Sequence, residues 1–408
     1  MSQPFSQKIE LVVIQPSPFC NIDCRYCYLP DRGNRKVLEE ATLAKIYERL
    51  FASAHLGDRI SILWHAGEPL AVPIAFYEKA FALLAQYNVK NIPVRQLFQT
   101  NCTLITQEWC DFFKRHQAHI GVSIDGPQRI HDANRVTRSG KGTFERAIRG
   151  VKLLQANGIL LHNIGVLTST ALDHPDEMWD FFMGLGITHL AFNVEETEGA
   201  NTQSSVRHAA DVARYQAFFR RFRQLRKASG RDVRIRELDN MEERVRFVSG
   251  ELQSALNQPM GTLSFDCEGN ISTFSPELVT MRHSKYEHFK FGNVFDGAVD
   301  DILESPRFRA TYDDIRRGVA KCRAACPYFS LCGGGEPVNK LGENGTFDSM
   351  ETMHCRTIIQ GLCDVVLEGV EETLGIPSPP APAVPVQRVE RLRHAGRRCI
   401  PLEMVLCS

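Results

Sequence analysis

The stretch Pro16-Ser-Pro-Phe-Cys20-Asn-Ile-Asp-Cys24-Arg-Tyr-Cys27-Tyr28 carries three cysteines in the spacing Cys-x3-Cys-x2-Cys. A loop with this spacing folds back on itself and can aim three thiolates at one point. Three thiolates hold three irons of a [4Fe-4S] cube, which leaves the fourth iron open for a ligand that is not protein. The alternative is a zinc loop, but structural zinc sites usually pair two Cys-x2-4-Cys units, and no second pair lies nearby. The spacing therefore predicts a redox cluster.

The bulk composition narrows the class of protein. The 408 residues exceed one ordinary domain, so we expect two domains with enough core to fold without disulfides. Basic and acidic residues number 48 each, which gives no field for nucleic acid or an anionic membrane. The N-terminus lacks the plan of a secretory signal, and no apolar run approaches the ~18 residues of a membrane span. The odd count of 13 cysteines also favours a cytoplasmic location, where thiols stay free to bind metal.

From residue 9 onward, short apolar runs alternate with amphipathic stretches. We expect strands at 9–15, 59–65, 94–100, 120–125, 160–168 and 188–194. Helical patterns fall between them, near 43–51, 74–87, 107–115, 144–156 and 176–184. This alternation implies a parallel sheet, and six such units predict an α/β fold, a partial (β/α)6 barrel. Its motifs sit where strands end, as active sites of β/α barrels do.

The residue composition changes along the chain and suggests four parts. We expect the barrel at 1–230, a connecting segment at 231–258, a small cysteine-rich domain at 259–373, and a proline-rich linker and tail at 374–408. An amphipathic segment near 207–228 carries the basic run Arg220, Arg221, Arg223, Arg226 and Lys227. That run is most simply a solvated face, and docking of a peptide is the alternative.

The cysteine loop resembles that of the radical S-adenosylmethionine (SAM) superfamily. In that family the open iron chelates the amino and carboxylate groups of SAM, and an injected electron cleaves the sulfonium to a 5′-deoxyadenosyl radical. The resemblance implies a [4Fe-4S] cluster on Cys20, Cys24 and Cys27, bound SAM, and an electron donor such as flavodoxin or ferredoxin. Tyr26 matches the family's aromatic residue next to adenine, although a core tyrosine would look the same.

Further segments extend this resemblance. Residues 64–69, Trp-His-Ala-Gly-Glu-Pro, resemble the family's Gly-Gly-Glu-Pro segment, where a backbone edge and a carboxylate receive the SAM ammonium. Gly67 would permit close backbone approach, and Glu68 would accept from the cation. Ser123 matches a ribose-contacting serine, and Arg135 matches an arginine that pairs with the SAM carboxylate. The other strand-end residues that we expect to face the same cavity are Gln99, Asn101 and Asp125. A structural role in the loops is the alternative for all of these polar residues.

The 259–373 region resembles the SPASM module, which carries auxiliary clusters in peptide-modifying radical SAM enzymes. Its usual run is Cys-x2-Cys-x5-Cys-x3-Cys plus a distant cysteine. Here the first gap is one residue longer, and Glu336 stands where the fourth cysteine would be. The cysteines that remain are Cys322, Cys326, Cys332 and Cys355. Four thiolates suffice to close one auxiliary [4Fe-4S] cluster, with zinc as the competing occupant.

The second SPASM cluster looks lost. Its usual Gly-x4-Cys turn corresponds to residues 269–274, so Phe274 replaces a ligand, and Cys267 alone cannot hold a cube. The cysteines that fall within or beside regular elements, and that we expect in the core, are Cys102, Cys110 and Cys363.

Longer stretches between about residues 9 and 370 resemble the cyclophane-forming maturases of ribosomal peptides, especially the glycine-rich-repeat peptide maturases. This resemblance implies a carbon–carbon crosslink, in a ribosomal precursor peptide, between an aromatic ring and the Cβ of a residue two positions on. Rearomatisation of the ring needs a base, for which the candidates are Glu195, Glu196, Glu277 and Glu336, each with a surface salt bridge as its alternative role. We expect the leader of such a peptide to bind the 207–245 region, the second domain or a partner.

Two other functions remain open. An anaerobic sulfatase maturase oxidises cysteine or serine to formylglycine, a reaction associated with an aspartate directly after the Gly-x4-Cys turn. Ser275 occupies that position here, which counts against it. A peptide-binding scaffold without activity is the non-enzymatic alternative, and the complete cysteine loop argues against it.

Overall fold

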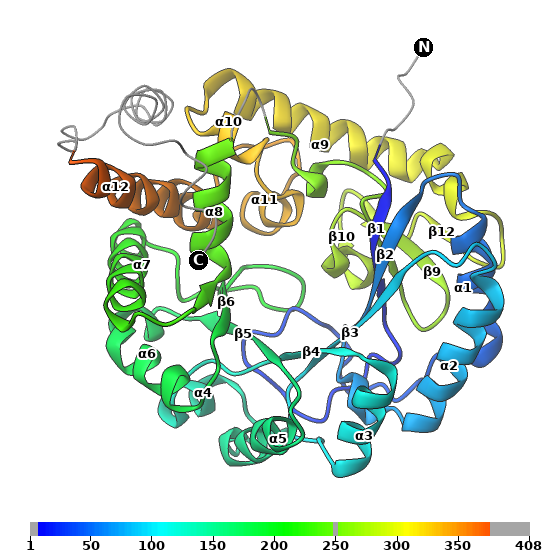
Figure 1. Cartoon of the computed structure of the whole chain (residues 1–408). Coiled ribbons are helices and arrows are strands. Elements are labelled where there is room, and N and C mark those ends of the chain that lie inside the picture. Colours follow the sequence, from blue (N-terminus) through cyan, green and yellow to red (C-terminus); the bar gives the residue numbers. More distant parts are fainter. Residues whose placement is uncertain (1–6, 248–251, 376–408) are drawn as a thin grey trace.

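A ten-stranded sheet organises the molecule, with the strand order β12-β9-β8-β1-β2-β3-β4-β5-β6-β7. The computed structural model describes residues 7–247 and 252–375. The six strands of the barrel are parallel neighbours: β1 (Ile9–Ile14), β2 (Leu56–Trp64), β3 (Val94–Thr100), β4 (His119–Val122), β5 (Leu161–Leu167) and β6 (His189–Val194). The sheet curves and carries helices on its outer side (Figure 1). The predicted partial barrel is therefore confirmed.

The barrel helices follow the strands in turn. They are α1 (Glu40–Ala52), α2 (Ile74–Tyr87), α3 (Gln107–His116), α4 (Gln128–Asn134), α5 (Phe144–Ala156), α6 (Pro175–Gly184) and α7 (Ala209–Ser229). Their apolar stripes face the sheet: in α1 the buried side chains include Leu43, Ile46, Tyr47 and Leu50, spaced by three or four residues. The predicted bounds of β3, α2 and α5 agree with the structure, whereas the short α4 had no prediction.

The fourth strand ends three residues earlier than expected. The prediction placed it at 120–125, but β4 stops at Val122. Beyond that point the backbone of Ile124 pairs with a side chain instead of a strand: its N–H donates to Asn163 Oδ1 at 3.1 Å, and its carbonyl accepts from Asn163 Nδ2 at 3.0 Å. This exchange frees Ser123 and Asp125 to form the mouth of the barrel.

The cysteine-rich part continues the same sheet. Strand β8 (Thr262–Phe265) pairs in parallel with β1, and β9 (Asn270–Thr273) and β12 (Gly292–Asn293) extend the edge. The other short strands are β7 (Arg234–Ile235), β10 (Arg282–His283) and β11 (Glu287–His288). The division that we predict at residue 259 thus falls where the sheet is continuous.

Helices of the C-terminal part close over the barrel (Figure 1). They are α8 (Arg236–Phe247), α9 (Pro306–Ala325), α10 (Phe329–Cys332), α11 (Pro337–Asn344), the π-helix η6 (Cys355–Gly361) and α12 (Leu362–Leu374). Short 3-10 turns lie at η1 (Pro69–Ala71), η2 (Ala171–Asp173), η3 (Ala255–Asn257), η4 (Pro276–Thr280) and η5 (Val299–Glu304). Most of the predicted tail, from residue 376 on, lies outside the described residues. None of the helices in 7–247 and 252–375 is long and apolar enough to cross a membrane.

Four arginines of the predicted basic run form ion pairs with acidic side chains of the same chain. Arg220 and Arg223 pair with glutamates of α12, Arg221 pairs with Asp176 of α6, and Arg226 pairs with two acids of α8. These ion pairs join α7 to its neighbours. The run therefore forms ion pairs with its neighbours, while Arg221 and Lys227 remain exposed to solvent, as the solvated-face interpretation expects.

Candidate active site

The cysteine loop follows β1 and is held by its own charged residues. Arg32 donates to Asp23 Oδ1 from Nε at 2.9 Å and from Nη2 at 2.7 Å, and the Cys20 N–H donates to the Arg32 carbonyl at 3.0 Å. Burial raises the pKa of Cys24 to about 12, with Arg135 opposing and Cys27 adding to the rise. Thiols that are buried and feel each other's charge need a cationic centre to exist as thiolates, which is what an iron cluster provides.

The ends of β3 and β4 meet this loop, as predicted. Gln99 Nε2 donates to Ser123 Oγ at 2.8 Å, which joins the two strand ends. Asn101 Nδ2 donates to Asn21 Oδ1 at 2.9 Å and lies 3.8 Å from Cys20 Sγ. An amide donor beside a cysteine sulfur suits a thiolate that binds iron, because hydrogen bonds to sulfur stabilise its charge.

Asp125, Arg135 and Tyr26 form one buried group. Arg135 Nε donates to Asp125 Oδ1 at 3.0 Å, the Tyr26 hydroxyl donates to Asp125 Oδ2, and the guanidinium lies 5.6 Å from the tyrosine ring centroid. Burial works against the charged form of Arg135, but Asp125 and Tyr26 raise its pKa above the usual range. The predicted partner of a ligand carboxylate thus already has a carboxylate partner, so any ligand would share it.

Glu68 is expected to offer a carboxylate to a bound cation, but its oxygens already accept hydrogen bonds from the protein. Its carboxylate is 1% exposed and accepts from Leu70 N at 3.0 Å, Thr100 Oγ1 at 2.7 Å and Asn101 N at 2.8 Å. Burial raises the pKa of Glu68 to about 7, against the effect of these donors. Gly67 has φ +138°, and a Cβ there would lie 2.3 Å from the Ser17 carbonyl oxygen. The close approach at Gly67 is therefore to the start of the cysteine loop.

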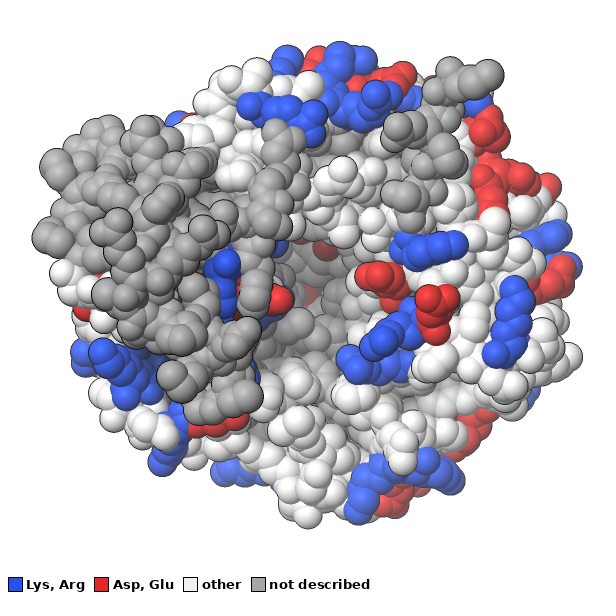
Figure 2. All heavy atoms as spheres, turned by 45° about the horizontal axis from the view of Figure 1, so that its top comes forward, with Lys and Arg blue, Asp and Glu red and all other residues white. Residues whose placement is uncertain are grey.

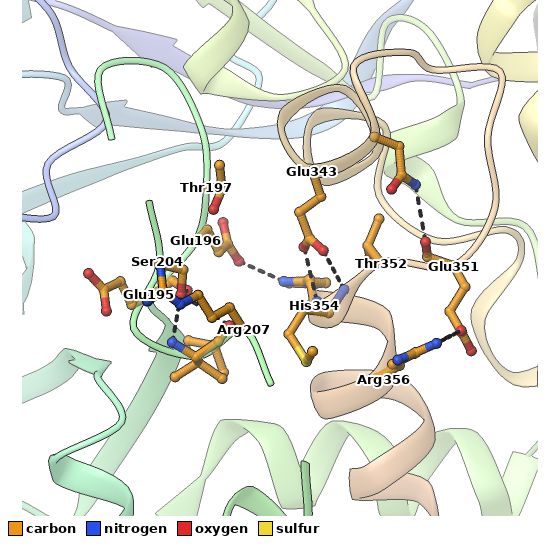
Figure 3. A pocket seen from close by; sticks show the side chains of 14 residues that line it. Glu195, Glu196, Thr197, Ser204, Arg207, Glu343, Glu351, Thr352, His354 and Arg356 are labelled. Carbon is orange, nitrogen blue, oxygen red and sulfur yellow. Dashed lines mark hydrogen bonds and ion pairs between the residues drawn. The ribbon is translucent and has the colours of Figure 1, made fainter. Parts of the chain in front are cut away.

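A group of acids lies between the barrel mouth and the C-terminal part, and we call it the carboxylate cluster: Glu196, Glu198, Glu277 and Glu336, with His354. Glu196 Oε1 lies 2.6 Å from His354 Nδ1, and Glu336 Oε1 lies 3.5 Å from His354 Nε2. Figure 3 shows Glu196 and His354 pointing toward one another in the wall of a pocket of 350 Å³. Both residues also line a second cavity, of 250 Å³, together with Glu277 and Glu336. The pair thus forms a wall between two cavities.

The electrostatics of this cluster are those of crowded acids. Burial raises the pKa of Glu277 to about 7, and the charges of Glu196 and Glu336 act in the same direction. Burial and the neighbouring acids also raise the pKa of Glu198 well above its usual range, and its Oε2 has no hydrogen-bond partner among the described residues. The pKa of Glu277 thus lies near neutral pH, which suits a general base, whereas, against the effect of burial, His354 lowers the pKa of Glu336.

Three of the four acids that the sequence offered as base candidates lie in this cluster, and the sequence analysis named neither Glu198 nor His354. Glu198 and His354 carried no signal beyond their positions, one in the acidic run 195–198 and one beside Cys355. Glu195 is the reverse case: it accepts from the Ser205 N–H at 2.9 Å and from the Ser205 hydroxyl, and so it is tied to its own loop.

The loop of residues 195–201 spans the two cysteine regions. The Ala200 N–H donates to the carbonyl of Tyr28, the residue after Cys27, at 2.8 Å. On its other side, a Cβ at Gly342 of α11 would lie 1.8 Å from the Thr197 carbonyl oxygen, so only glycine allows this contact. The loop that carries Glu196 and Glu198 is consequently held between the cysteine loop and α11, the helix that follows Cys332.

The four C-terminal cysteines come from α9, the turn after it, the end of α10 and the start of η6. Burial raises the pKa of Cys355 to about 12, and Cys332, Cys326 and Cys322 add to the rise through their charges, so the four sulfurs are neighbours. Their sulfurs accept from Gly334 N at 3.3 Å, Lys340 Nζ at 3.5 Å and Gln360 Nε2 at 3.6 Å. This donor set fits an anionic thiolate cluster.

No three His, Cys, Asp or Glu side chains of the described residues group closely enough to hold a single metal ion. Zinc would need its ligands on one ion, whereas a cube distributes its thiolates over separate irons. At the other predicted SPASM position, Phe274 is fully buried and stacks on Phe308 at 5.9 Å and on Tyr312 at 5.9 Å. Aromatic packing thus fills that position.

Comparisons with known proteins agree with this geometry. Residues 14–181 match the model of the Radical SAM superfamily. An uncharacterized protein of Synechocystis sp., sll1766, is 41% identical over 370 residues, which cover 90% of this chain and 93% of that protein. A serine-type anaerobic sulfatase-maturating enzyme of Bacteroides thetaiotaomicron is 25% identical over 353 residues, 83% of this chain and 84% of the enzyme.

Among solved structures, native anSMEcpe with bound AdoMet and Cp18Cys peptide is similar with a TM-score of 0.74 and 20% identity, covering 89% of this chain and 98% of that chain. At this identity the likeness supports the fold.

Proposed function

Because this chain belongs to the radical SAM superfamily, we propose that it is an oxidoreductase that modifies a side chain of a peptide with S-adenosylmethionine and two [4Fe-4S] clusters. Cys20, Cys24 and Cys27 would hold the first cluster, and the four C-terminal cysteines would hold the auxiliary one. When bound, these groups supply a radical that removes a hydrogen atom from carbon and an acceptor for one further electron.

One observation carries the proposal: the carboxylate cluster lies between the two cysteine regions. A side chain that loses a hydrogen atom and then an electron must also release a proton, so a proton acceptor is needed at this position. Glu277 is the first candidate, since its pKa near 7 leaves part of its population ionised at neutral pH. His354 holds Glu196 and Glu336 from its two ring nitrogens and so fixes the wall around it.

The substrate that we propose is a ribosomal precursor peptide. Figure 2 shows a hollow in one face of the molecule. The two cavities that share Glu196 and His354 give an extended chain a place beside the acids. The fold is similar to that of a protein solved with a bound peptide, which supports this class of partner. A flavodoxin or ferredoxin is the electron donor that we propose.

Two reactions fit the geometry equally well, because both remove two hydrogens from the substrate and both need a base. The first is the crosslink between an aromatic ring and the Cβ of a residue two positions on. Ser275 favours it, since it replaces the aspartate associated with formylglycine formation. The second is oxidation of serine or cysteine to formylglycine, which the similarity to a serine-type sulfatase-maturating enzyme favours.

Mass alone does not separate these reactions, because a crosslink and the oxidation of serine both remove two hydrogens. The test is to incubate the reconstituted protein, without oxygen, with SAM, dithionite and either the peptide encoded beside its gene or a sulfatase-derived peptide. A hydrazide probe labels formylglycine but not a crosslink. A crosslink instead suppresses backbone fragment ions between the joined residues. Turnover of neither peptide, while both clusters are loaded, would overturn the proposal.

A further inference from the structure

Lys340 is a buried lysine beside the auxiliary cysteines. The residue is 3% exposed, and its Nζ donates to Cys322 Sγ at 3.5 Å. No carboxylate of the described residues forms an ion pair with it. A buried ammonium is costly unless an anion faces it, so the sulfur group is the counter-charge that this lysine requires.

Two glycines lie beside the Lys340 side chain. Gly318 lies one turn before Cys322 on the same face of α9, and a Cβ there would be 2.2 Å from the Phe347 carbonyl oxygen and 3.3 Å from the Lys340 ammonium. A Cβ at Gly335 would be 3.6 Å from Cε of Lys340. The ammonium is therefore placed over the face of α9 that carries the Cys322 sulfur.

The remaining sulfur donors of this region are neutral. The Gly334 N–H and the Gln360 amide can hydrogen-bond a thiolate, but they bring no net charge. The potential of an iron–sulfur cluster depends on its net charge, on hydrogen bonds to its sulfurs and on exposure to solvent. A thiolate-bound cube becomes more negative by one charge on reduction, and a buried cation stabilises that extra charge.

We propose that Lys340 tunes the auxiliary cluster, raising its reduction potential so that it can take up the electron which the substrate releases. This inference rests on the proposed function, since it needs the cluster on Cys322, Cys326, Cys332 and Cys355. The couple is a one-electron step: the oxidised cluster gains one electron, and the substrate radical that supplies it loses its proton to the carboxylate cluster. Lys340 acts through the sulfur and is a positioning residue.

The experiment measures the potential of the auxiliary cluster alone. The full chain with Cys20, Cys24 and Cys27 changed to alanine serves as background, and the cluster is titrated with dithionite and mediators under electron paramagnetic resonance. Lys340→Met removes the charge and the donor, Lys340→Gln keeps a donor without charge, and Lys340→Arg keeps the charge. Lys321→Met is the matched control, because Lys321 adjoins Cys322 in α9 but is half exposed and paired with Asp348.

With unchanged iron content, Lys340→Met should shift the reduction equilibrium at least tenfold toward the oxidised form, which is about 59 mV for one electron. The reduction potential of Lys340→Gln should lie between those of Lys340→Met and the unchanged protein. The potentials of Lys340→Arg and Lys321→Met should stay near that of the unchanged protein. If Lys340→Met and Lys340→Gln lose iron and Lys340→Arg keeps it, the iron content, in place of the potential, shows that the cluster needs a positive charge at this position. Equal potentials for Lys340→Met and the unchanged protein would overturn the tuning role and leave the proposed function standing. A background protein without any cluster would overturn both.

Discussion

Two regions of the cysteine-rich part, one around Cys332 and one around Phe274, are filled by different kinds of side chains. Around Cys332, two buried and two half-buried thiols lie together, and amide and ammonium groups donate to their sulfurs. Around Phe274, where the related module has a second cluster, the corresponding volume holds aromatic rings: Phe274 and Phe308 stack with only 2° between their planes, and Phe291 meets Phe274 edge-on at 6.5 Å. One end is built to hold a charged group, and the other is built to exclude it.

This difference shows how a fold can lose a cofactor without losing its shape. Aromatic rings bury large areas and pack in defined geometries, so they can supply the cohesion that a cluster would give. Phe274 even keeps the left-handed backbone of the turn, with φ +78°. A polar atom left in that volume would need a partner, whereas a ring needs none. We call the region around Phe274 the aromatic end, and the region of Cys322, Cys326, Cys332 and Cys355 the thiol end. We infer that the aromatic end is structural and that the thiol end carries the chemistry.

The largest effect should come from breaking the thiol end. Cys332→Ala removes one of four auxiliary ligands, so iron in the reconstituted protein should fall from about eight toward about four atoms per chain, from two cubes to one. Product formation should stop, while 5′-deoxyadenosine still forms because the first cysteine loop is unchanged. Iron analysis and chromatography of the reaction mixture check both results. About twelve irons in the unchanged protein would contradict the single auxiliary site.

The proton acceptor beside the thiol end gives the second prediction. Glu277→Gln should lower product formation about 10²- to 10⁴-fold, the usual contribution of a general base, while SAM cleavage continues. Glu195→Gln is the matched control, because Glu195 is bound to Ser205 and should leave the rate nearly unchanged. Equal losses in the two variants would remove Glu277 from the reaction.

The pH profile of product formation sharpens that test. Because the pKa of Glu277 is raised from 4.5 to about 7, the ionised base grows as pH rises through 7, and the rate should rise and then level off. The free energy of unfolding changes in the opposite direction. Between pH 4.5 and about 7 the folded protein keeps a proton on Glu277 that the unfolded chain has released, so the stabilisation from this proton is lost as pH rises through 7. The rise in rate should be missing in Glu277→Gln.

The aromatic end should respond in stability and not in iron content. Phe274→Ala removes a fully buried ring, and such truncations cost about 3–5 kcal/mol of unfolding free energy. Denaturant unfolding of the apo protein measures the loss, and iron content should be unchanged after reconstitution. Phe274→Cys is the sharper variant: with Cys267 it offers two thiols, too few for a cube, so it should bind no additional iron. Additional iron in that variant would show that the aromatic end still forms a cluster site.

The sequence predicts the barrel well because its signals are local. The stripes of α1 and the apolar runs of β1–β6 repeat within a few residues, and the cysteine spacing lies within one loop. The carboxylate cluster could be predicted only in part, since its members come from four separate places: the loop after β6, the turn η4, the residue before α11 and the residue before η6. Nothing near Glu198 or His354 in the chain marks them, because their contacts form only when the loop of residues 195–201 is clamped by Gly342 and Tyr28.

Contacts between distant parts of the chain also bear on two alternatives that the sequence left open. Glu195 carries the same carboxylate as Glu196, but successive side chains at the end of a strand point to opposite sides, and only Glu196 faces His354. For the basic run of α7, the sequence left peptide docking open as the alternative, because ion pairs between helices cannot be recognised from one segment. Arg220 pairs with Glu368, which lies 148 positions further along the chain.

The smallest effect should come from Cys267, the one cysteine left at the aromatic end. It is buried, and burial first and then Asp266 and Glu268 raise its pKa to about 11, so it remains a neutral thiol at physiological pH. Cys267→Ser keeps the size of the side chain, and we expect iron content, cluster spectra and product formation to match the unchanged protein. Alkylation under native conditions should also be slow, because the thiolate is the reactive form. A loss of iron in Cys267→Ser would mean that the aromatic end still contributes a ligand, and the contrast between the two ends would no longer hold.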